Sequence, residues 1–193
     1  MGGSAVQGRI SGPVPAGLTV IETMRAENGA IALWPLHLER LRCDCAAVGF
    51  LLDEARVRAC LAGLPKVGLR RVRLTVDAAG EVQVTHHDVP PNPLFWNVKL
   101  SDLRLDSSDP WLRIKTSRRP VYDAARLAMG KDADEVILRN ERGDICEGTI
   151  TNLFLRRGGR LLTPPVTCGL LPGVLRASLL ARREAEETRL TLA

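Results

Sequence analysis

The chain has 193 residues, 45% of them hydrophobic, and a formal net charge of +5 that comes from 23 arginines and only four lysines. This length allows one large domain or two small ones, and no apolar run approaches the roughly 20 residues that span a bilayer, which excludes a membrane-spanning protein. The arginines are scattered and aromatic residues make up only 4% of the chain, so nucleic acid is not the expected partner.

The first half of the sequence predicts a small α+β domain over residues 18–90. Residues 1–17 are rich in Gly, Ser and Pro and are expected to form a flexible N-terminus. Periodicity, caps and turn residues predict the elements that follow. They are a strand over 18–24, a hairpin turn at 28–29, helices over 36–48 and 53–64, and strands over 69–76 and 81–86.

Three prolines within residues 89–93 cannot continue a helix or an interior strand, so a linker is predicted over 91–96. A larger α+β domain is then expected over 97–193. Its predicted elements are strands over 97–105 and 111–115, a helix over 120–129, strands over 135–139, 145–155 and 160–163, and a loop at 169–173 that leads into a helix.

Three segments of this second half carry groups that suit pyridoxal phosphate. Lys115 leaves an apolar predicted strand, where burial would make its amine nucleophilic towards an aldehyde. Glu147 could keep the ring nitrogen protonated, and Gly148 would let a flat ring lie close to the backbone. The amides of Val174 and Leu175, at a predicted helix start, could bind a phosphate. Each signal is weak alone, because strand-end lysines and turn glutamates are usually solvated.

The residues after Glu147 are read as a continuing strand. Thr149 and Thr151 would then share a face with Glu147 and line the same pocket, where they could contact a substrate. Asn152 would point to the other face and make a structural hydrogen bond. The five cysteines are odd in number and lack metal-ligand spacing, which indicates free thiols in a reducing, cytoplasmic compartment and no metal site.

The segments Glu147-Gly148 to Asn152-Leu153-Phe154 and Leu171-Pro172-Gly173 with Arg176 resemble the class IV pyridoxal-phosphate aminotransferases of fold type IV. This family includes branched-chain and D-amino-acid aminotransferases and aminodeoxychorismate lyase, and the resemblance runs from Leu18 to the end. It implies a two-domain α+β enzyme, usually a homodimer. Lys115 would form the Schiff base, Glu147 would pair with the ring nitrogen, and Leu171 would pack against the ring.

The same resemblance implies roles for four further residues. Arg40 is placed as a phosphate ligand, although a charged helix residue is more often solvated. Arg25 and Arg73 match positions that contact substrate carboxylates, although both could be surface charges of strands. Tyr122 lies seven residues after Lys115, as in lyase-type members, and is expected to contact the substrate.

Two departures from the family pattern bear on activity. Leu175 stands where branched-chain enzymes have a threonine, so only its backbone amide would serve the phosphate. Family members also continue for a few dozen residues beyond Ala193, through strands that complete the phosphate and substrate sites. The chain is therefore expected to be truncated at its C-terminal part, to come from a damaged gene copy, or to bind the cofactor poorly.

The predicted function is that of a lyase that releases 4-aminobenzoate and pyruvate from aminodeoxychorismate, a step of folate biosynthesis. Features that favour the lyase are the Ile-Glu-Thr-Met-Arg opening, the short N-terminus and the position of Tyr122. A branched-chain or D-amino-acid aminotransferase is the first alternative. A non-catalytic relative that keeps the fold as a binding or dimerisation module is the second.

Overall fold

The computed structural model describes residues 8–192, which divide into two compact units. The first unit holds the chain up to Pro91 together with the short segment Ile114–Arg118, and the second holds Asn92–Arg113 and the chain from Arg119 onward. The sequence predicts Ile114–Arg118 as part of the second domain, whereas the structure has this segment in the first unit. The chain thus enters the first unit twice. Residues 1–7 of the N-terminus that was expected to be flexible lie outside the described part.

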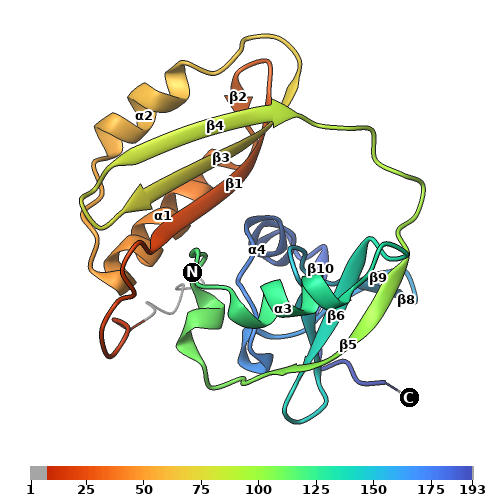
Figure 1. Cartoon of the computed structure of the whole chain (residues 1–193). Helices are drawn as coiled ribbons and strands as arrows, with labels where there is room; N and C mark the ends of the chain where they lie inside the picture. The colour runs from red at the N-terminus through yellow and green to blue at the C-terminus, as the bar shows by residue number, and fades with distance from the viewer. Residues whose placement is uncertain (1–7, 193) are drawn as a thin grey trace. The chain divides into compact units, whose positions relative to one another are not determined.

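The first unit is built on a four-stranded antiparallel sheet (Figure 1). Strands β1 and β3 pair along their whole length, with Thr23 opposite Arg73 and Arg25 opposite Arg71. Alternation of β-branched and polar residues produces one buried face and one exposed face. The strands lie in the order β2-β1-β3-β4, with bounds β1 Thr19–Glu27, β2 Ala30–Ile31, β3 Leu69–Asp77 and β4 Val82–Asp88.

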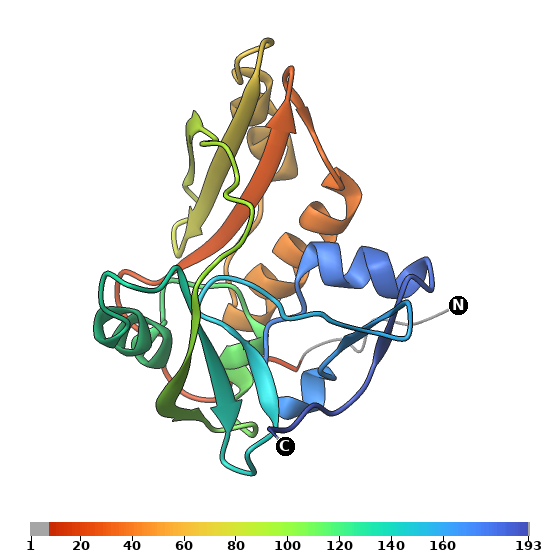
Figure 2. The ribbon, with the colours of Figure 1, turned by 90° about the vertical axis from the view of Figure 1, so that its right-hand side faces the viewer.

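Two helices, α1 (Trp34–Val48) and α2 (Glu54–Ala62), cover one face of this sheet (Figure 2). Helix α1 ends at Gly49, whose φ of 77° suits a residue without a side chain. The side chain of Asp53 caps α2 by accepting the N–H of Arg56 at 3.0 Å. These predicted caps are confirmed. The buried core between sheet and helices includes Val20, Met24, Leu41, Cys45, Val57, Val72 and Leu74.

The part of the N-terminal segment that the structure describes is anchored at one point. Ile10 is only 8% exposed, and its N–H donates to the carbonyl of Ala47 at 2.9 Å. The expectation of a flexible segment up to residue 17 is therefore wrong at Ile10, because an apolar side chain there packs with the first unit.

The second unit contains two three-stranded sheets and two helices. One sheet has the order β5-β6-β7, with β5 parallel to β6, and packs against α3; the other has the order β10-β9-β8 and packs against α4. A buried cluster that includes Leu105, Tyr122, Leu138, Cys146 and Leu170 forms one core. The bounds are β5 Val98–Leu105, α3 Pro120–Ala128, β6 Glu135–Asn140, β7 Ile145–Gly148, β8 Leu155–Arg157, β9 Arg160–Thr163, α4 Val174–Ala181 and β10 Ala185–Glu187.

Two predicted strands differ from the structure. Pro110–Arg113 forms a 3-10 turn instead of a strand, because the Asp109 carboxylate accepts the N–H of Trp111 and starts a helical turn at the proline. The strand predicted over 145–155 ends at Gly148. No helix in the described part of the chain is long and apolar enough to span a membrane.

Candidate active site

Lys115 is held along the edge of β1 in the first unit. Its carbonyl accepts the N–H of Ile21 at 2.8 Å, and the next residue, Thr116, forms a bridge with Val20. On its other side the N–H of Lys115 donates to the Asp44 carboxylate of α1 at 2.9 Å. The half-buried lysine therefore has a backbone fixed from both a strand and a helix, although it does not leave a strand as predicted.

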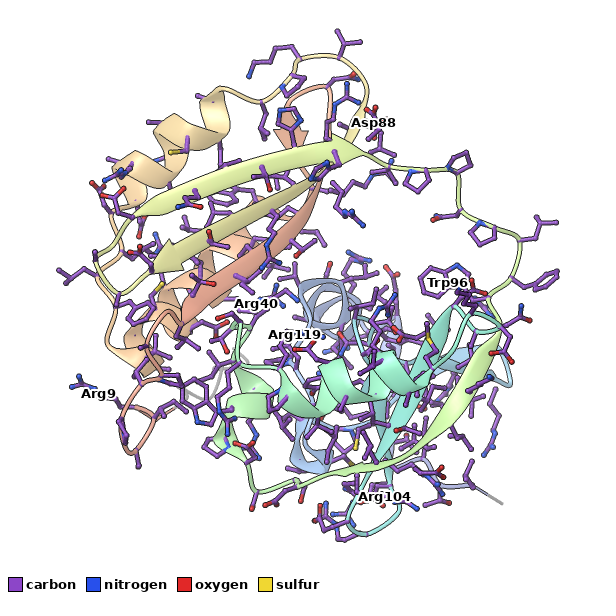
Figure 3. The ribbon with its side chains drawn as sticks, in the orientation of Figure 1. Arg9, Arg40, Asp88, Trp96, Arg104 and Arg119 are labelled. Carbon is purple, nitrogen blue, oxygen red and sulfur yellow. The ribbon has the colours of Figure 1, made fainter. Side chains whose placement is uncertain are left out.

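Arg40 lies on α1 and is paired with a buried carboxylate of β1. Its Nε and Nη2 donate to the two oxygens of Glu22 at 2.7 and 2.6 Å, and Nδ1 of His37 lies 2.7 Å from Oε2 of the same residue. Burial raises the pKa of Glu22, but the hydrogen bonds from His37 and Arg40 outweigh it and hold this pKa below its usual range. The label in Figure 3 marks Arg40 beside the sheet of the first unit. The guanidinium is thus fixed, and its phosphate role stays a prediction.

Arg25 and Arg73 lie on the same exposed face of the sheet, opposite the helices. The strand register also places Arg71 on this face, directly across from Arg25. Arg25 pairs with Glu27 at 3.0 Å, whereas within the described residues neither Arg71 nor Arg73 has a carboxylate within ion-pair distance. Arg71 was missed from the sequence. Arg71 and Arg73 are two residues apart in the predicted strand and must share a face, so the sequence did contain a signal for Arg71.

Glu147, at the end of β7 in the second unit, accepts hydrogen bonds from side chains and from a backbone amide. The hydroxyl of Tyr122 donates to Oε1 at 2.6 Å, the N–H of Leu171 donates to the same oxygen at 3.0 Å, and Nδ2 of Asn152 donates to Oε2 at 3.1 Å. The residue is only 4% exposed. Because each of these partners is a donor, together they stabilise an ionised carboxylate in a fixed orientation.

Tyr122 is buried in the core cluster of the second unit, and its hydroxyl is directed at Glu147. Burial raises the pKa of Tyr122 far above its usual value, and the neighbouring Glu147 charge raises it further. The guanidinium of Arg119, at the start of α3 (Figure 3), lies 4.9 Å from the ring centre. Substrate contact by Tyr122 stays a prediction, whereas its contact with Glu147 is a structural fact that the sequence did not indicate.

Thr149 and Thr151 do not share a face with Glu147, so this prediction is wrong. The chain turns after Gly148, and both hydroxyls donate to the carboxylate of Glu135, at 2.5 and 3.0 Å. The backbone amides of Thr149 and Ile150 donate to the same carboxylate. Burial raises the pKa of Glu135, but these hydrogen bonds outweigh it and lower the pKa. A buried carboxylate 14 residues away thus shapes the turn, and substrate contact by the threonines remains untested.

For Asn152 the predicted structural hydrogen bond is confirmed, but the predicted position on the opposite face is wrong. Its amide nitrogen donates both to Glu147 and to the carbonyl of Leu171 at 3.0 Å, so it lies beside the carboxylate and not on the opposite face. Gly148 also has another reason to be a glycine. A Cβ at this position would meet Thr151 Oγ1 at 2.3 Å and the Glu135 carboxylate at 2.8 Å, so the space is filled by the protein itself.

Helix α4 begins at Val174, two residues after Pro172. Its N-cap is Gly173, which makes no side-chain capping bond, and the first bond of the helix runs from the N–H of Ala177 to the carbonyl of Gly173. The amides of Val174 and Leu175 therefore stand at the positive end of the helix, as predicted. Their use by a phosphate stays a prediction.

The groups in each unit match the chemistry that pyridoxal phosphate requires. The first unit offers an amine at Lys115 and a fixed guanidinium at Arg40, and the second offers the Glu147 carboxylate and the amides that start α4. An aldehyde, a pyridine nitrogen and a phosphate are the groups that such residues bind. Each unit therefore carries groups that suit a part of the cofactor. Among the described residues no group of three metal-binding side chains is found.

Comparison with known proteins finds similarity to aminotransferases and to aminodeoxychorismate lyase. The model of the family described as amino-transferase class IV matches residues 19–193. The crystal structure of a "putative amino-acid aminotransferase" from Mesorhizobium loti has a TM-score of 0.84 and 41% identity, over 90% of this chain and 87% of that one. Aminodeoxychorismate lyase of Bacillus subtilis is 28% identical, over 83% of this chain and 62% of its own length. A probable branched-chain-amino-acid aminotransferase of Thermotoga maritima is 36% identical over 86 residues, 43% of this chain and 30% of its own.

Proposed function

Because this chain belongs to the class IV aminotransferase family, whose members depend on pyridoxal phosphate, we propose that it is a lyase that converts aminodeoxychorismate to 4-aminobenzoate and pyruvate. The cofactor supplies an electron sink for the bond-breaking step. The single observation that carries the proposal beyond the family is the row of arginines on the exposed face of the first sheet.

Lys115 would bind the cofactor covalently and, once released by the substrate amine, move the proton at its Nζ. Its backbone hydrogen bonds to Ile21 and Asp44 would hold the Cα of Lys115, from which the side chain extends, in place during both steps. Glu147 would hold the ring nitrogen protonated, since its donors favour the charged carboxylate. Arg40 and the amides of α4 would bind the phosphate.

The arginine face supports a substrate with two carboxylates. Arg25, Arg71 and Arg73 lie together on β1 and β3, and among the described residues only Arg25 of these three forms an ion pair with a carboxylate. Aminodeoxychorismate carries two carboxylates, whereas a branched-chain amino acid carries one carboxylate and an apolar side chain. A face with three cations suits the first substrate better, because a second carboxylate can form a charged hydrogen bond there and a branched apolar side chain cannot.

Two alternatives stay open. A branched-chain or D-amino-acid aminotransferase would use the same Lys115 and Glu147 and would leave a 2-oxo acid. The similarity to the Thermotoga maritima protein favours this reading for part of the chain. A non-catalytic relative would keep the fold without turnover. By resemblance alone we also propose a homodimer in the cytoplasm that acts in folate biosynthesis.

The decisive experiment loads the purified protein with pyridoxal phosphate and treats it with borohydride. Visible absorbance of the bound cofactor and a reduced adduct mapped by mass spectrometry to Lys115 are expected, and Lys115→Ala should abolish both. Lys131→Ala, which changes an exposed lysine in the same way, is the matched control. An adduct on another lysine would contradict the assignment, and no adduct would favour the non-catalytic relative.

Substrate trials then separate the two enzymatic readings. The lyase reading predicts 4-aminobenzoate and pyruvate in equal amounts from aminodeoxychorismate. Arg73→Gln should raise KM for that substrate by about tenfold, because one charged hydrogen bond is lost. Conversion of branched-chain amino acids to 2-oxo acids, without 4-aminobenzoate formation, would instead establish the aminotransferase.

A further inference from the structure

Asp44 is a buried carboxylate that none of the expected roles uses. It lies on α1, is only 3% exposed, and its Oδ2 accepts the backbone N–H of Lys115 at 2.9 Å. A carboxylate in such a position is costly unless it is paired or hydrogen-bonded. Its placement beside the lysine therefore calls for a reason beyond packing.

The charged groups around Asp44 come from three elements of the first unit. Arg40 lies one turn earlier on α1, Glu22 lies on β1, and Lys115 lies on the segment 114–118. Burial raises the pKa of Asp44 to about 7, against the opposing effects of the Lys115 N–H and the Arg40 charge. Asp44 thus gains its charge near neutral pH and attracts the Lys115 ammonium.

We propose that Asp44 is a positioning residue for Lys115: its buried carboxylate accepts the backbone N–H of the lysine and places a titratable group beside it. The importance of this action for catalysis rests on the proposed function, in which Lys115 carries the cofactor and moves the proton. The structural coupling itself stands on the described contacts of the first unit.

The action of Asp44 on the Lys115 backbone follows from the geometry of their hydrogen bond. Lys115 is bonded on one side to Ile21 of β1 and on the other to Asp44 of α1. Loss of the bond to Asp44 would remove the attachment of the Lys115 backbone to α1. The action of the Asp44 charge on the Lys115 amine follows because one attraction acts on both groups. An attraction that lowers the proton affinity of Asp44 raises that of Lys115 by the same free energy.

The test uses the four lysines of the chain as separate reporters in the cofactor-free protein. Reductive 13C-methylation gives one NMR signal for each lysine, and Lys115→Ala identifies the signal of interest. Asp44→Asn keeps an oxygen acceptor for the Lys115 N–H but removes the charge. We expect the Lys115 signal to titrate about one pH unit lower in this variant, with the other three signals unchanged.

Asp53→Asn is the matched control, because it makes the same change at an exposed N-cap where asparagine also caps well. It should leave all four titrations unchanged. The unmodified sequence offers a second readout, since the Lys115 signal should show an additional step near pH 7 as Asp44 ionises. Absence of this step together with an unshifted titration in Asp44→Asn would overturn the proposal.

The backbone part has its own readout. Amide hydrogen exchange at Lys115 should stay slow in Asp44→Asn and become at least about tenfold faster in Asp44→Leu, which removes the acceptor. Equal exchange in both variants would refute the backbone role. These results do not depend on cofactor binding, so failure of Lys115 to take up pyridoxal phosphate would refute the proposed function and leave the coupling standing.

Discussion

The hydroxyl of Tyr122 donates a 2.6 Å hydrogen bond to Oε1 of Glu147, and both groups are buried. Tyr122 is the single tyrosine of the chain. Its ultraviolet absorbance therefore reports on the surroundings of one carboxylate, and this carboxylate is the proposed partner of the cofactor ring.

The titration of Tyr122 should respond to the charge of Glu147. Burial and then the Glu147 carboxylate raise the pKa of Tyr122, so Glu147→Gln should lower the pH at which tyrosinate forms, while burial keeps it above the usual value. Tyrosinate absorbance measured against pH in the cofactor-free protein checks this. Tyr122→Phe supplies the blank, and Glu186→Gln, at an exposed ion pair of the same unit, is the control. An unchanged titration in Glu147→Gln would contradict the coupling.

Asp44 should make stability depend on pH in a particular direction. Its pKa is raised to about 7 in the folded protein and is about 4 in an unfolded chain, so the folded state holds the extra proton between these values. Stability should therefore fall as pH rises from about 4 to about 7. Asp44→Asn should lack this fall in stability. The Tm of the variant minus the Tm of the native protein should therefore increase as pH rises from about 4 to about 7.

Thermal unfolding at several pH values measures this difference, and the native-minus-variant difference isolates Asp44 from other titrating groups. Asp53→Asn should show no comparable change. A Tm difference between Asp44→Asn and the native protein that is constant from pH 4 to 8 would show that Asp44 keeps one protonation state throughout.

Glu22 should act in the opposite sense. Its pKa is lowered in the folded protein, so its stabilisation is present above the unfolded value of about 4.3 and is lost as pH falls through the folded value. Glu22→Gln removes the negative charge that the largely buried Arg40 guanidinium contacts and should cost about 3 kcal/mol near pH 7.

Urea unfolding at pH 7 and below pH 4 tests this prediction, with the cost expected to shrink at the lower pH. Glu81→Gln breaks an exposed pair with Arg56 in the same unit and should cost much less. Equal costs for the two variants would mean that burial adds nothing to the Glu22 pair.

Gly173 should not tolerate a side chain. A Cβ there would lie 1.8 Å from Oδ1 of Asn152, the residue that donates to Glu147. Gly173→Ala should therefore displace Asn152 and destabilise the protein by about 2 kcal/mol. Gly63→Ala, whose Cβ would meet only Cys60 O at 3.5 Å, is the control in urea unfolding. A Gly173→Ala protein as stable as the control would show that Asn152 can move freely.

Local patterns predicted the first unit well. The spacing of Leu38, Leu41, Cys45 and Val48 predicted α1, and Gly49 and Asp53 marked its end and the start of α2. These signals are local, because caps and periodicity depend on neighbours along the chain. Family resemblance placed Lys115 and Glu147 as candidates, and their immediate contacts were not foreseen.

The missed features depend on partners distant in sequence. Glu135 turns the chain after Gly148 through bonds to Thr149 and Thr151, and a pattern of alternating residues cannot reveal such a partner. Asp44 is a different case. It lies three residues after Leu41, on the apolar side of the predicted helix, so a polar residue at an inward position was a readable signal.

The segment Ile114–Arg118 belongs to the first unit, although the residues on both sides of it belong to the second unit. This arrangement affects when the first unit can fold during synthesis. A chain released or cut at Pro91 would contain the four-stranded sheet and both helices, yet the Ile21 amide and the Asp44 carboxylate would lack the backbone groups they bind. The first unit therefore cannot be completed during synthesis until Arg118 has left the ribosome. No single cut yields it whole, and a recombinant version would need residues 114–118 grafted back through a linker.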